Sequence, residues 1–385
     1  MRRWLFKLVN MRILGIVNET FDADKGYGGA VKVFIELLRN NEAIVLGSRG
    51  AIDACLYGGL TRAKYVEIPS LRSAGTGVKI LFNMVKSIAV ASNISEGVHI
   101  VFSLSSSIID SLPGYLIARM KHAKWVSTFY HVIPSKRSGK LSIRALFSSI
   151  LQKSSLLILM KADLVITQVP TVANYLLKWH VQSRRIVMIG PGGVDEAQAM
   201  QSRTLSISYD ACFLGRIHVL KGIFDLLEAW RIVCRVRPDA KLVVMGYGSE
   251  RDIAVFQDKI EKYGLRDNVV FLGYVDEALK YSVLKSSKIL MCPSYEDPCS
   301  IAVSEALYCG VPVVLYRDPL YGVTYQGATE VERGDIKALA NSALRFLQDQ
   351  NLRDTYSARA KESAQRFGWS RIAEQVINAI GDIAP

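Results

Sequence analysis

The sequence has few of the residues that metal clusters and disulfide scaffolds require. Its 385 residues include six cysteines and five histidines. The cysteines form no C-x-x-C pair, and no Cys/His spacing typical of a zinc site occurs. Cys212 and Cys292 fall inside apolar runs, which favours reduced thiols in the core of a cytosolic protein. We therefore predict no Cys/His metal site.

The sequence also lacks a long uninterrupted apolar run. Because no stretch of about 18 uncharged apolar residues occurs, we predict no transmembrane helix. The apolar part of residues 1–10 (MRRWLFKLVN) is too short for a signal peptide, so we expect a cytoplasmic protein. With 50% hydrophobic and 22% charged residues the chain is globular, and its length predicts two domains.

Acidic residues are missing from one long stretch. Residues 111–162 contain no Asp or Glu but nine Lys or Arg residues, and four more, Arg2, Arg3, Lys7 and Arg12, lie near the N-terminus. These thirteen charges equal the net charge of +13, so the rest of the chain is balanced. The basic surface therefore belongs to the N-terminal half.

Three interpretations of this basic half can be compared. Nucleic-acid binding fits less well, because the sequence has no helix-turn-helix, zinc, RRM or KH signature. Residues 141–160 mix apolar side chains with scattered basic ones, as helices at a membrane interface do. Two alternatives stay open: contact with an anionic membrane surface or lipid phosphate, and a core helix with a solvated basic face.

Apolar strand-like runs alternate with helical stretches, which predicts parallel, doubly wound sheets. In the first half we predict strands at 12–17, 43–47, 65–68, 99–103, 125–130, 161–168 and 185–189, with helices at 30–39, 78–92, 113–120 and 171–180. In the second half we predict strands at 209–214, 241–245, 269–272 and 288–292, with helices at 223–236, 335–347 and 369–380.

A Gly/Pro cluster separates the two halves. Residues 190–195 (GPGGVD) follow a complete α/β unit and are a candidate hinge, with 196–208 as a linker. We predict an N-terminal Rossmann-like domain at 1–190, a C-terminal one at 191–368, and a final helix at 369–385.

Two loops carry phosphate-binding features. Gly26, Gly28 and Gly29 stand between a strand and a helix, where glycines let backbone N–H groups approach a ligand, although ordinary turns also use them. In GRIHVLKG, Arg216 and Lys221 lie at a strand-to-helix junction. A guanidinium fork and a mobile ammonium there suit a diphosphate, the alternative being two solvated surface cations.

Residues 294–314 (SYEDPCSIAVSEALYCGVPVV) hold the most informative pattern. A buried strand leads into an acidic loop, a helix that starts near Ser300 and stops at Gly310, and another strand. Asp297 and Glu305 flank seven residues at the carboxyl edge of the sheet, where ligands bind. Carboxylates there suit the hydroxyls of a ribose or hexose; the alternative is a turn former and a solvated helical glutamate.

This stretch resembles the E-x7-E region of the retaining glycosyltransferases of family four, and GRIHVLKG resembles that family's G-R-x4-K-G. Asp297 stands where the first glutamate is usual, and Cys299 and Ser300 replace a Phe-Gly pair. The resemblance implies a GT-B fold: two doubly wound Rossmann-like domains facing a central cleft. It also implies hexose transfer from a UDP or GDP sugar, with retention by a front-face route.

The resemblance assigns roles at the donor site. Arg216, Lys221 and the helix start at Ser300 and Ile301 would hold the diphosphate. Glu305 would hold the ribose and Asp297 the sugar hydroxyls.

Further roles follow from the same resemblance. His131, after a strand of the first domain, would position donor sugar and acceptor, and Gly28 and Gly29 would face the diphosphate or the acceptor. Gly246 lies in a G-x-G turn on the nucleotide side, and Tyr274 would stack on the base or only pack.

No metal or other cofactor is expected, because the D-x-D at residues 22–24 lies outside the predicted donor domain. The acceptor, a glycan or a lipid-linked sugar, is left open. Two alternatives remain: a catalytically degenerate GT-B nucleotide-binding or scaffold protein, and a GT-B epimerase, which ranks last because few histidines are well placed.

Overall fold

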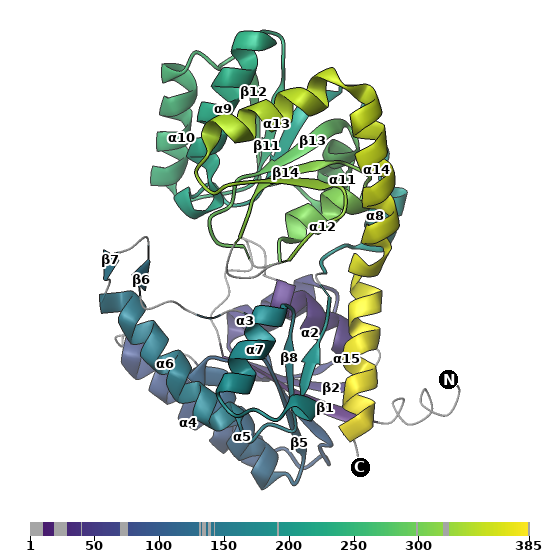
Figure 1. Cartoon of the computed structure of the whole chain (residues 1–385). Helices are drawn as coiled ribbons and strands as arrows, with labels where there is room; N and C mark the ends of the chain where they lie inside the picture. The colour runs from purple at the N-terminus through teal and green to yellow at the C-terminus, as the bar shows by residue number, and fades with distance from the viewer. Residues whose placement is uncertain are drawn as a thin grey trace. The chain divides into compact units, whose positions relative to one another are not determined.

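The computed structural model describes residues 11–18, 29–39, 41–69, 76–130, 132, 136–137, 140–141, 143–190, 192–297, 299–318 and 323–383. The chain divides into two compact units. The first unit is Met1–Gly190 together with Ser370–Pro385, and the second is Pro191–Trp369. Figure 1 shows an α/β sandwich in each unit.

The first unit is built on a seven-stranded parallel sheet in the order β3-β2-β1-β4-β5-β8-β9. The strands are β1 (Arg12–Val17), β2 (Glu42–Gly47), β3 (Lys64–Glu67), β4 (Ile100–Ser103), β5 (Lys124–Thr128), β8 (Leu164–Thr167) and β9 (Ile186–Met188). The order reverses between β1 and β4, so the predicted doubly wound topology is confirmed. A two-stranded antiparallel ribbon pairs β6 (Lys136–Arg137) with β7 (Lys140–Leu141).

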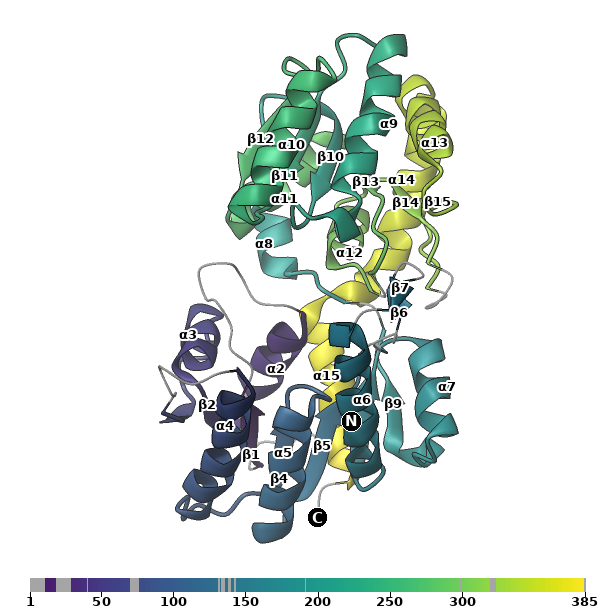
Figure 2. The ribbon, with the colours of Figure 1, turned by 90° about the vertical axis from the view of Figure 1, so that its left-hand side faces the viewer.

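Helices cover this sheet. They are α2 (Gly29–Arg39), α3 (Arg49–Tyr57), α4 (Thr76–Ser92), α5 (Ile108–Met120), α6 (Ile143–Leu159), α7 (Pro170–Lys178) and α15 (Trp369–Ile383). Figure 2 shows α4, α5 and α6 as neighbours, and α5 contacts the other two. Among the described residues no helix is long and apolar enough to cross a bilayer.

The predicted start of α5 at residue 113 was wrong, because the helix begins at Ile108 and includes Pro113. Proline has no N–H to donate to the carbonyl four residues earlier, which is that of Ile109. The Asn18 side-chain amide donates to this carbonyl instead, at 2.9 Å. A residue at the end of β1 thus replaces the missing helical hydrogen bond.

The second unit has a six-stranded parallel sheet in the order β12-β11-β10-β13-β14-β15. The strands are β10 (Tyr209–Leu214), β11 (Leu242–Met245), β12 (Val269–Gly273), β13 (Ser287–Cys292), β14 (Val313–Tyr316) and β15 (Ala328–Val331). The helices are α8 (Glu196–Gln201), α9 (Ile223–Val236), α10 (Glu250–Lys262), α11 (Glu277–Lys285), α12 (Ile301–Tyr308), α13 (Ile336–Gln348) and α14 (Gln350–Ala364).

Alternate residues of this sheet enter two separate cores, as the two-residue repeat of a strand requires. Ala211 and Phe213 pack with apolar residues of α9, α10 and α13 on one face. Cys212 packs with residues of α11, α12 and α14 on the other. The sheet is therefore buried on both faces, which explains why its strands read as continuous apolar runs.

The predicted linker 196–208 was partly wrong, because it begins with helix α8. Asp195 caps this helix: its carboxylate accepts a hydrogen bond from the Gln198 backbone N–H at 3.0 Å. The Asp of the GPGGVD run is therefore a helix cap, which satisfies one of the free N–H groups of the first turn.

Candidate active site

The predicted donor-site residues gather where the strand order of the second unit reverses. β10 and β13 are neighbours, and the chain winds away from them in opposite directions. Such a switch point leaves a crevice at the carboxyl ends of the strands, where α/β proteins bind ligands. The two loops are joined there, because the Tyr295 backbone N–H donates to the Leu220 carbonyl at 2.9 Å.

Lys221 and Asp297 meet at this point, although 76 residues separate them. The Lys221 Nζ lies 2.7 Å from Asp297 Oδ2, and each side chain keeps about one fifth of its surface exposed. The pair is thus shielded enough for a strong interaction and open enough for a ligand to reach either member. Arg216 lies after the same strand as Lys221 and is exposed. Within the described part of the chain, Arg216 has no ion-pair partner.

Two glycines let backbone segments approach closely around this crevice. Gly222 has φ +68°, and a Cβ there would lie 1.8 Å from the Pro293 carbonyl oxygen. Gly246 has φ +149°, and a Cβ there would lie 1.8 Å from the Gly215 carbonyl oxygen. Packing of the loops therefore requires glycine at both positions, independently of any contact with a ligand.

Helix α12 points its N-terminus into the same region. Ser300 is its N-cap, is buried and makes no side-chain capping hydrogen bond. The Ser300 hydroxyl instead lies 3.8 Å from the Cys292 sulfur. The first N–H groups of the helix, from Ile301 onward, are of the kind that bind phosphate.

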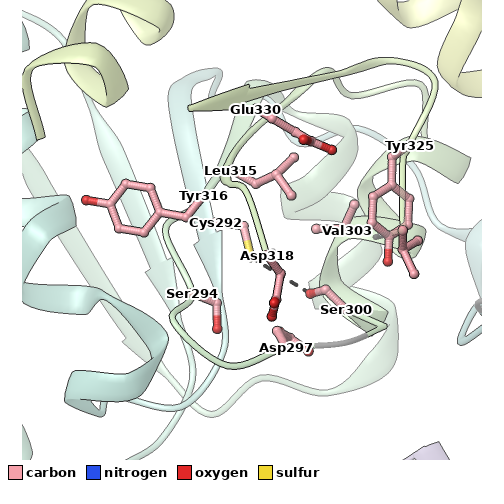
Figure 3. A pocket seen from close by; sticks show the side chains of 11 residues that line it. Cys292, Ser294, Asp297, Ser300, Val303, Leu315, Tyr316, Asp318, Tyr325 and Glu330 are labelled. Carbon is pink, nitrogen blue, oxygen red and sulfur yellow. Dashed lines mark hydrogen bonds between the residues drawn. The ribbon is translucent and has the colours of Figure 1, made fainter. Parts of the chain in front are cut away.

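A pocket of about 410 Å³, its open mouth included, lies next to this helix start. It is lined by Cys292, Ser294, Asp297, Ser300, Val303, Leu315, Tyr316, Asp318, Val323, Tyr325 and Glu330. Figure 3 shows the side chains of Asp297, Ser300 and Asp318 converging. Carboxylates and hydroxyls suit a ligand rich in hydroxyl groups rather than a phosphate.

The charges around the pocket are partly balanced. Arg317 lies 3.2 Å from Glu330, and Arg333 lies 3.3 Å from Asp318. Burial, and then the Asp297 charge, raises the pKa of the Cys292 thiol to about 11, so it stays neutral. Cys292 is buried and packs here as a small residue.

Glu305 lies deeper than the other predicted site residues. Its Oε1 accepts from Lys280 Nζ at 2.6 Å and from the Tyr281 hydroxyl at 3.4 Å, and only 3% of its side chain is exposed. Lys280 also lies 2.7 Å from Glu277. Burial alone would lower the pKa of Lys280, but the Glu305 and Glu277 carboxylates outweigh it and raise that pKa. Any contact between Glu305 and a ribose therefore requires some rearrangement around the carboxylate.

The Tyr281 hydroxyl has a second role. It accepts the Asp195 backbone N–H at 2.9 Å. The Glu305 carboxylate is thus connected through one side chain to the segment that enters the second unit.

Tyr274 stands at the carboxyl end of β12, and 53% of its side chain is exposed. Its ring meets that of Tyr247, from the loop after β11, at a centroid distance of 6.5 Å and an interplanar angle of 65°. The Gly246 backbone N–H donates to the Gly273 carbonyl at 2.8 Å, which holds the two loops together. Two aromatic rings on this edge suit a nucleobase.

Three predicted features fall outside the described residues: His131, Gly28 and the D-x-D at residues 22–24. Gly29 is the first residue of α2. No group of three or more His, Cys, Asp or Glu side chains that could hold a metal ion occurs among the residues with defined positions.

Sequence reasoning missed Lys280, Tyr247, Asp318 and Tyr325. Tyr247 could have been found, because it lies inside the G-x-G turn that was singled out. Lys280 could not, since its partner Glu305 lies 25 residues away on another helix. Asp318 and Tyr325 come from a loop without a recognisable motif.

Two units with doubly wound parallel sheets, the second carrying basic and acidic side chains at its switch point, are the arrangement expected of a GT-B protein. Residues 196–363 match the sequence model of the family described as Glycosyl transferases group 1. The phosphatidyl-myo-inositol mannosyltransferase of Mycobacterium leprae is 30% identical over 177 residues, which are 45% of this chain and 46% of that protein. The O-antigen chain mannosyltransferase B of Escherichia coli is 30% identical over 173 residues, 44% of this chain and 45% of that protein. The matched stretch thus spans about half the length of these curated relatives.

Solved structures resemble the whole chain. The Anabaena HepE structure with UDP and glucose has a TM-score of 0.75 at 16% identity and covers 97% of this chain and 100% of that chain. A sucrose-phosphate synthase from Thermosynechococcus elongatus has a TM-score of 0.72 at 18% identity, with 97% and 99% covered. At these identities the likeness shows the fold, and the predicted GT-B class is confirmed. The match of residues 196–363 to the glycosyl transferases group 1 model, together with these relatives, confirms the predicted resemblance.

Proposed function

We propose that the protein transfers a hexose from a nucleotide-diphosphate sugar, with UDP or GDP as the nucleotide, to a hydroxyl group of a glycan or lipid-linked acceptor. The Lys221–Asp297 pair beside the start of α12 carries this proposal. An ammonium and a helix N-terminus suit a diphosphate, and a carboxylate next to them suits a sugar hydroxyl. The relatives named as mannosyltransferases, and HepE with UDP and glucose, support it.

The proposed chemistry is charge stabilisation at the leaving group. Negative charge develops on the nucleoside diphosphate as the glycosidic bond breaks. Arg216, the Lys221 ammonium and the first N–H groups of α12 would stabilise that charge without a metal ion. The acceptor hydroxyl would attack the anomeric carbon on the side of the leaving group and pass its proton to the departing phosphate oxygen, so the anomeric configuration is retained. No cofactor other than the donor itself is part of the proposal.

Lys221 and Asp297 would then change partners during binding. A donor diphosphate competes with Asp297 for the Lys221 ammonium, and the released carboxylate accepts hydrogen bonds from the sugar. The pocket beside Asp297 and Ser300 offers more acceptors for the same hydroxyls. Glu305 would accept from the ribose, and the rings of Tyr247 and Tyr274 would border the base.

The proposed place of action is the cytosolic face of a membrane, with the protein bound peripherally. The basic first half of the chain favours an acceptor that carries lipid phosphate. One of the relatives is a phosphatidyl-myo-inositol mannosyltransferase, which supports a lipid acceptor for this chain.

The first experiment is thermal unfolding of the purified chain with UDP, GDP, ADP or CMP. A ligand at 100 times its dissociation constant adds about 2.7 kcal/mol to the free energy of unfolding. We expect a shift with one diphosphate that Arg216→Ala and Glu305→Ala abolish. Arg266→Ala is the matched control, because Arg266 is exposed and pairs with Glu261 on the surface.

Sugar transfer is then measured with the donors of the selected nucleotide. Arg216→Ala should lower transfer by about 10²–10³-fold while the unfolding curve stays unchanged. Wild-type turnover by Arg216→Ala would disprove this site. A nucleotide shift without transfer from any donor would favour the degenerate nucleotide-binding protein, an alternative that the Cys299–Ser300 replacement motivates.

A further inference from the structure

We infer that the outer surface of α4, α5 and α6 is a docking face for an anionic lipid bilayer. This docking face would bring the site to the lipid acceptor of the proposed function, so its biological role rests on that proposal. Its test does not depend on it. These helices are neighbours in the first unit. Each exposes large apolar side chains to solvent.

The exposed apolar residues come as pairs along each helix. They are Leu81 and Val85 on α4, Leu116 and Met120 on α5, and Ile150 and Leu157 on α6. Between 38% and 63% of each side chain is exposed. Single exposed apolar residues are ordinary, but six on three adjacent helices concentrate apolar surface in one part of the unit, as interaction surfaces do.

The charges on the same helices have one sign. Exposed basic side chains flank the apolar ones: Lys86 on α4, Arg119 on α5, and Lys153 on α6. The three helices contain one acid, Asp110, which is fully buried. Its carboxylate accepts from the Asn18 backbone N–H and from the Ser105 hydroxyl, at 2.9 and 2.7 Å, inside the unit. The outward surface of the described helices therefore offers no negative charge.

This combination selects the partner. Apolar side chains flanked by Lys and Arg match the interface of a bilayer with anionic headgroups, where apolar groups enter the acyl boundary and cations meet phosphates. No helix among the described residues is suited to cross the bilayer, so this contact would be peripheral. Binding of a protein partner to the same helices would not depend on the charge of lipid headgroups.

The test is flotation of the full chain with vesicles of phosphatidylcholine alone or with 30 mol% (about one third) phosphatidylglycerol, at low and high salt. We expect binding to the anionic vesicles at low salt, which weakens at high salt, and little binding to neutral vesicles. Lys86→Glu with Lys153→Glu should weaken binding by at least roughly 25-fold, since each lost basic residue contributes about a fivefold factor and each new carboxylate adds repulsion. Leu81→Gln with Leu157→Gln should weaken it by roughly tenfold or more through the apolar contact.

Matched controls lie in the second unit. Lys262→Glu with Lys337→Glu repeats the charge change, and Met200→Gln with Ile207→Gln repeats the apolar change at exposed positions. Both should bind as the wild type does. Equal loss in the controls, equal binding to neutral vesicles, or no binding at low salt would each overturn the inference. Self-association abolished by Leu81→Gln with Leu157→Gln, without vesicle binding, would also overturn it.

This design tests the docking face and the proposed sugar transfer separately. Each variant is also unfolded thermally with the nucleotide that stabilises the wild type. The docking variants should keep the wild-type melting temperature and its nucleotide shift, because none of the altered residues belongs to the second unit. Vesicle binding without any nucleotide shift would contradict the proposed function and leave the docking face intact.

Discussion

At the scale of single residues, Lys280 sets the electrostatics around Glu305. The ammonium lies between two carboxylates and is 9% exposed, while the Glu305 side chain is 3% exposed. Removing one partner of a buried pair leaves an uncompensated charge, which costs more than the pair itself contributes. The pair therefore fixes the Glu305 carboxylate at the point that the resemblance assigned to a ribose.

We expect Lys280→Met to lower the free energy of unfolding by about 3–5 kcal/mol, because the Glu305 carboxylate stays buried without its cation. Adding Glu305→Leu should restore much of the loss, because the double variant buries no unpaired charge. Urea unfolding of the two variants measures both effects. Arg266→Met, which breaks an exposed pair, should change the value by less than about 1 kcal/mol. A double variant as unstable as Lys280→Met would contradict the account.

Asp297 gives a prediction that separates binding from chemistry. Asp297→Asn removes the carboxylate that holds Lys221, so the ammonium becomes available to a diphosphate. We expect nucleoside diphosphate to bind at least as tightly as to the wild type, and sugar transfer to fall by about 10²-fold. Calorimetric titration and initial rates measure the two quantities. Weaker nucleotide binding would show that Asp297 does not compete with the ligand for Lys221.

The local sequence predicts the position of some site residues and not of others. Lys221 and Asp297 each follow a strand, so the topology of parallel sheets brings them to one edge without further information. Their pairing at 2.7 Å needs the order β10 beside β13, which a single sequence does not give. Lys280 lies on a helix whose only local signal is its capping Asp276, so its contact with Glu305 is purely tertiary.

At the scale of elements, several buried strands have the predicted bounds, and one helix start does not. Arg12–Val17 and Tyr209–Leu214 have the predicted bounds, because buried parallel strands are continuous apolar runs. The helix containing Pro113 was predicted too short, since proline usually ends or begins a helix. Only the contact with Asn18 on another element shows why it is tolerated.

Loop packing in the second unit gives a prediction at the same scale. Gly246→Ala should lower the free energy of unfolding by at least about 2 kcal/mol, because its φ of +149° is strained for alanine and the added Cβ meets the Gly215 carbonyl oxygen. Gly264→Ala is the matched control: its φ is +66°, but nothing lies within 4 Å of the added Cβ. It should cost only about 1–2 kcal/mol. Urea unfolding compares the two, and equal losses would show that conformation alone, not the loop contact, requires glycine at 246.

At the scale of the whole molecule, the asymmetry of charge was visible in the sequence, and its arrangement was not. The acid-free stretch 111–162 spans parts of α5 and α6, which pack side by side. Helix α4 packs against α5, although it is remote in sequence from α6. The six exposed apolar residues therefore come to lie on adjacent helices only in the folded unit.

Buried thiols in both units predict how stability depends on pH. Burial raises the pKa of Cys55 and Cys212 to about 12, and that of Cys292 to about 11, from an unfolded value of 9.0. Because the pKa is higher in the folded state, the stability that each protonated thiol contributes is fully present below pH 9. It is lost as the pH rises toward the folded pKa values. Each thiol should then lower the free energy of unfolding by about 1.4 kcal/mol per pH unit above 9.

Urea unfolding at pH 7.5, 9 and 10.5 measures this slope by tryptophan fluorescence, since Trp125 is buried in the first unit and Trp230 lies in the core of the second. Cys212→Ala should reduce the fall in stability between pH 9 and 10.5, because the variant has one proton fewer to lose on unfolding. Cys234→Ala should reduce this fall by less. Burial raises the pKa of Cys234 only to about 11, because its side chain is partly buried. An unfolding free energy that is independent of pH above 9 would mean that these thiols ionise as easily in the folded chain as in the unfolded one.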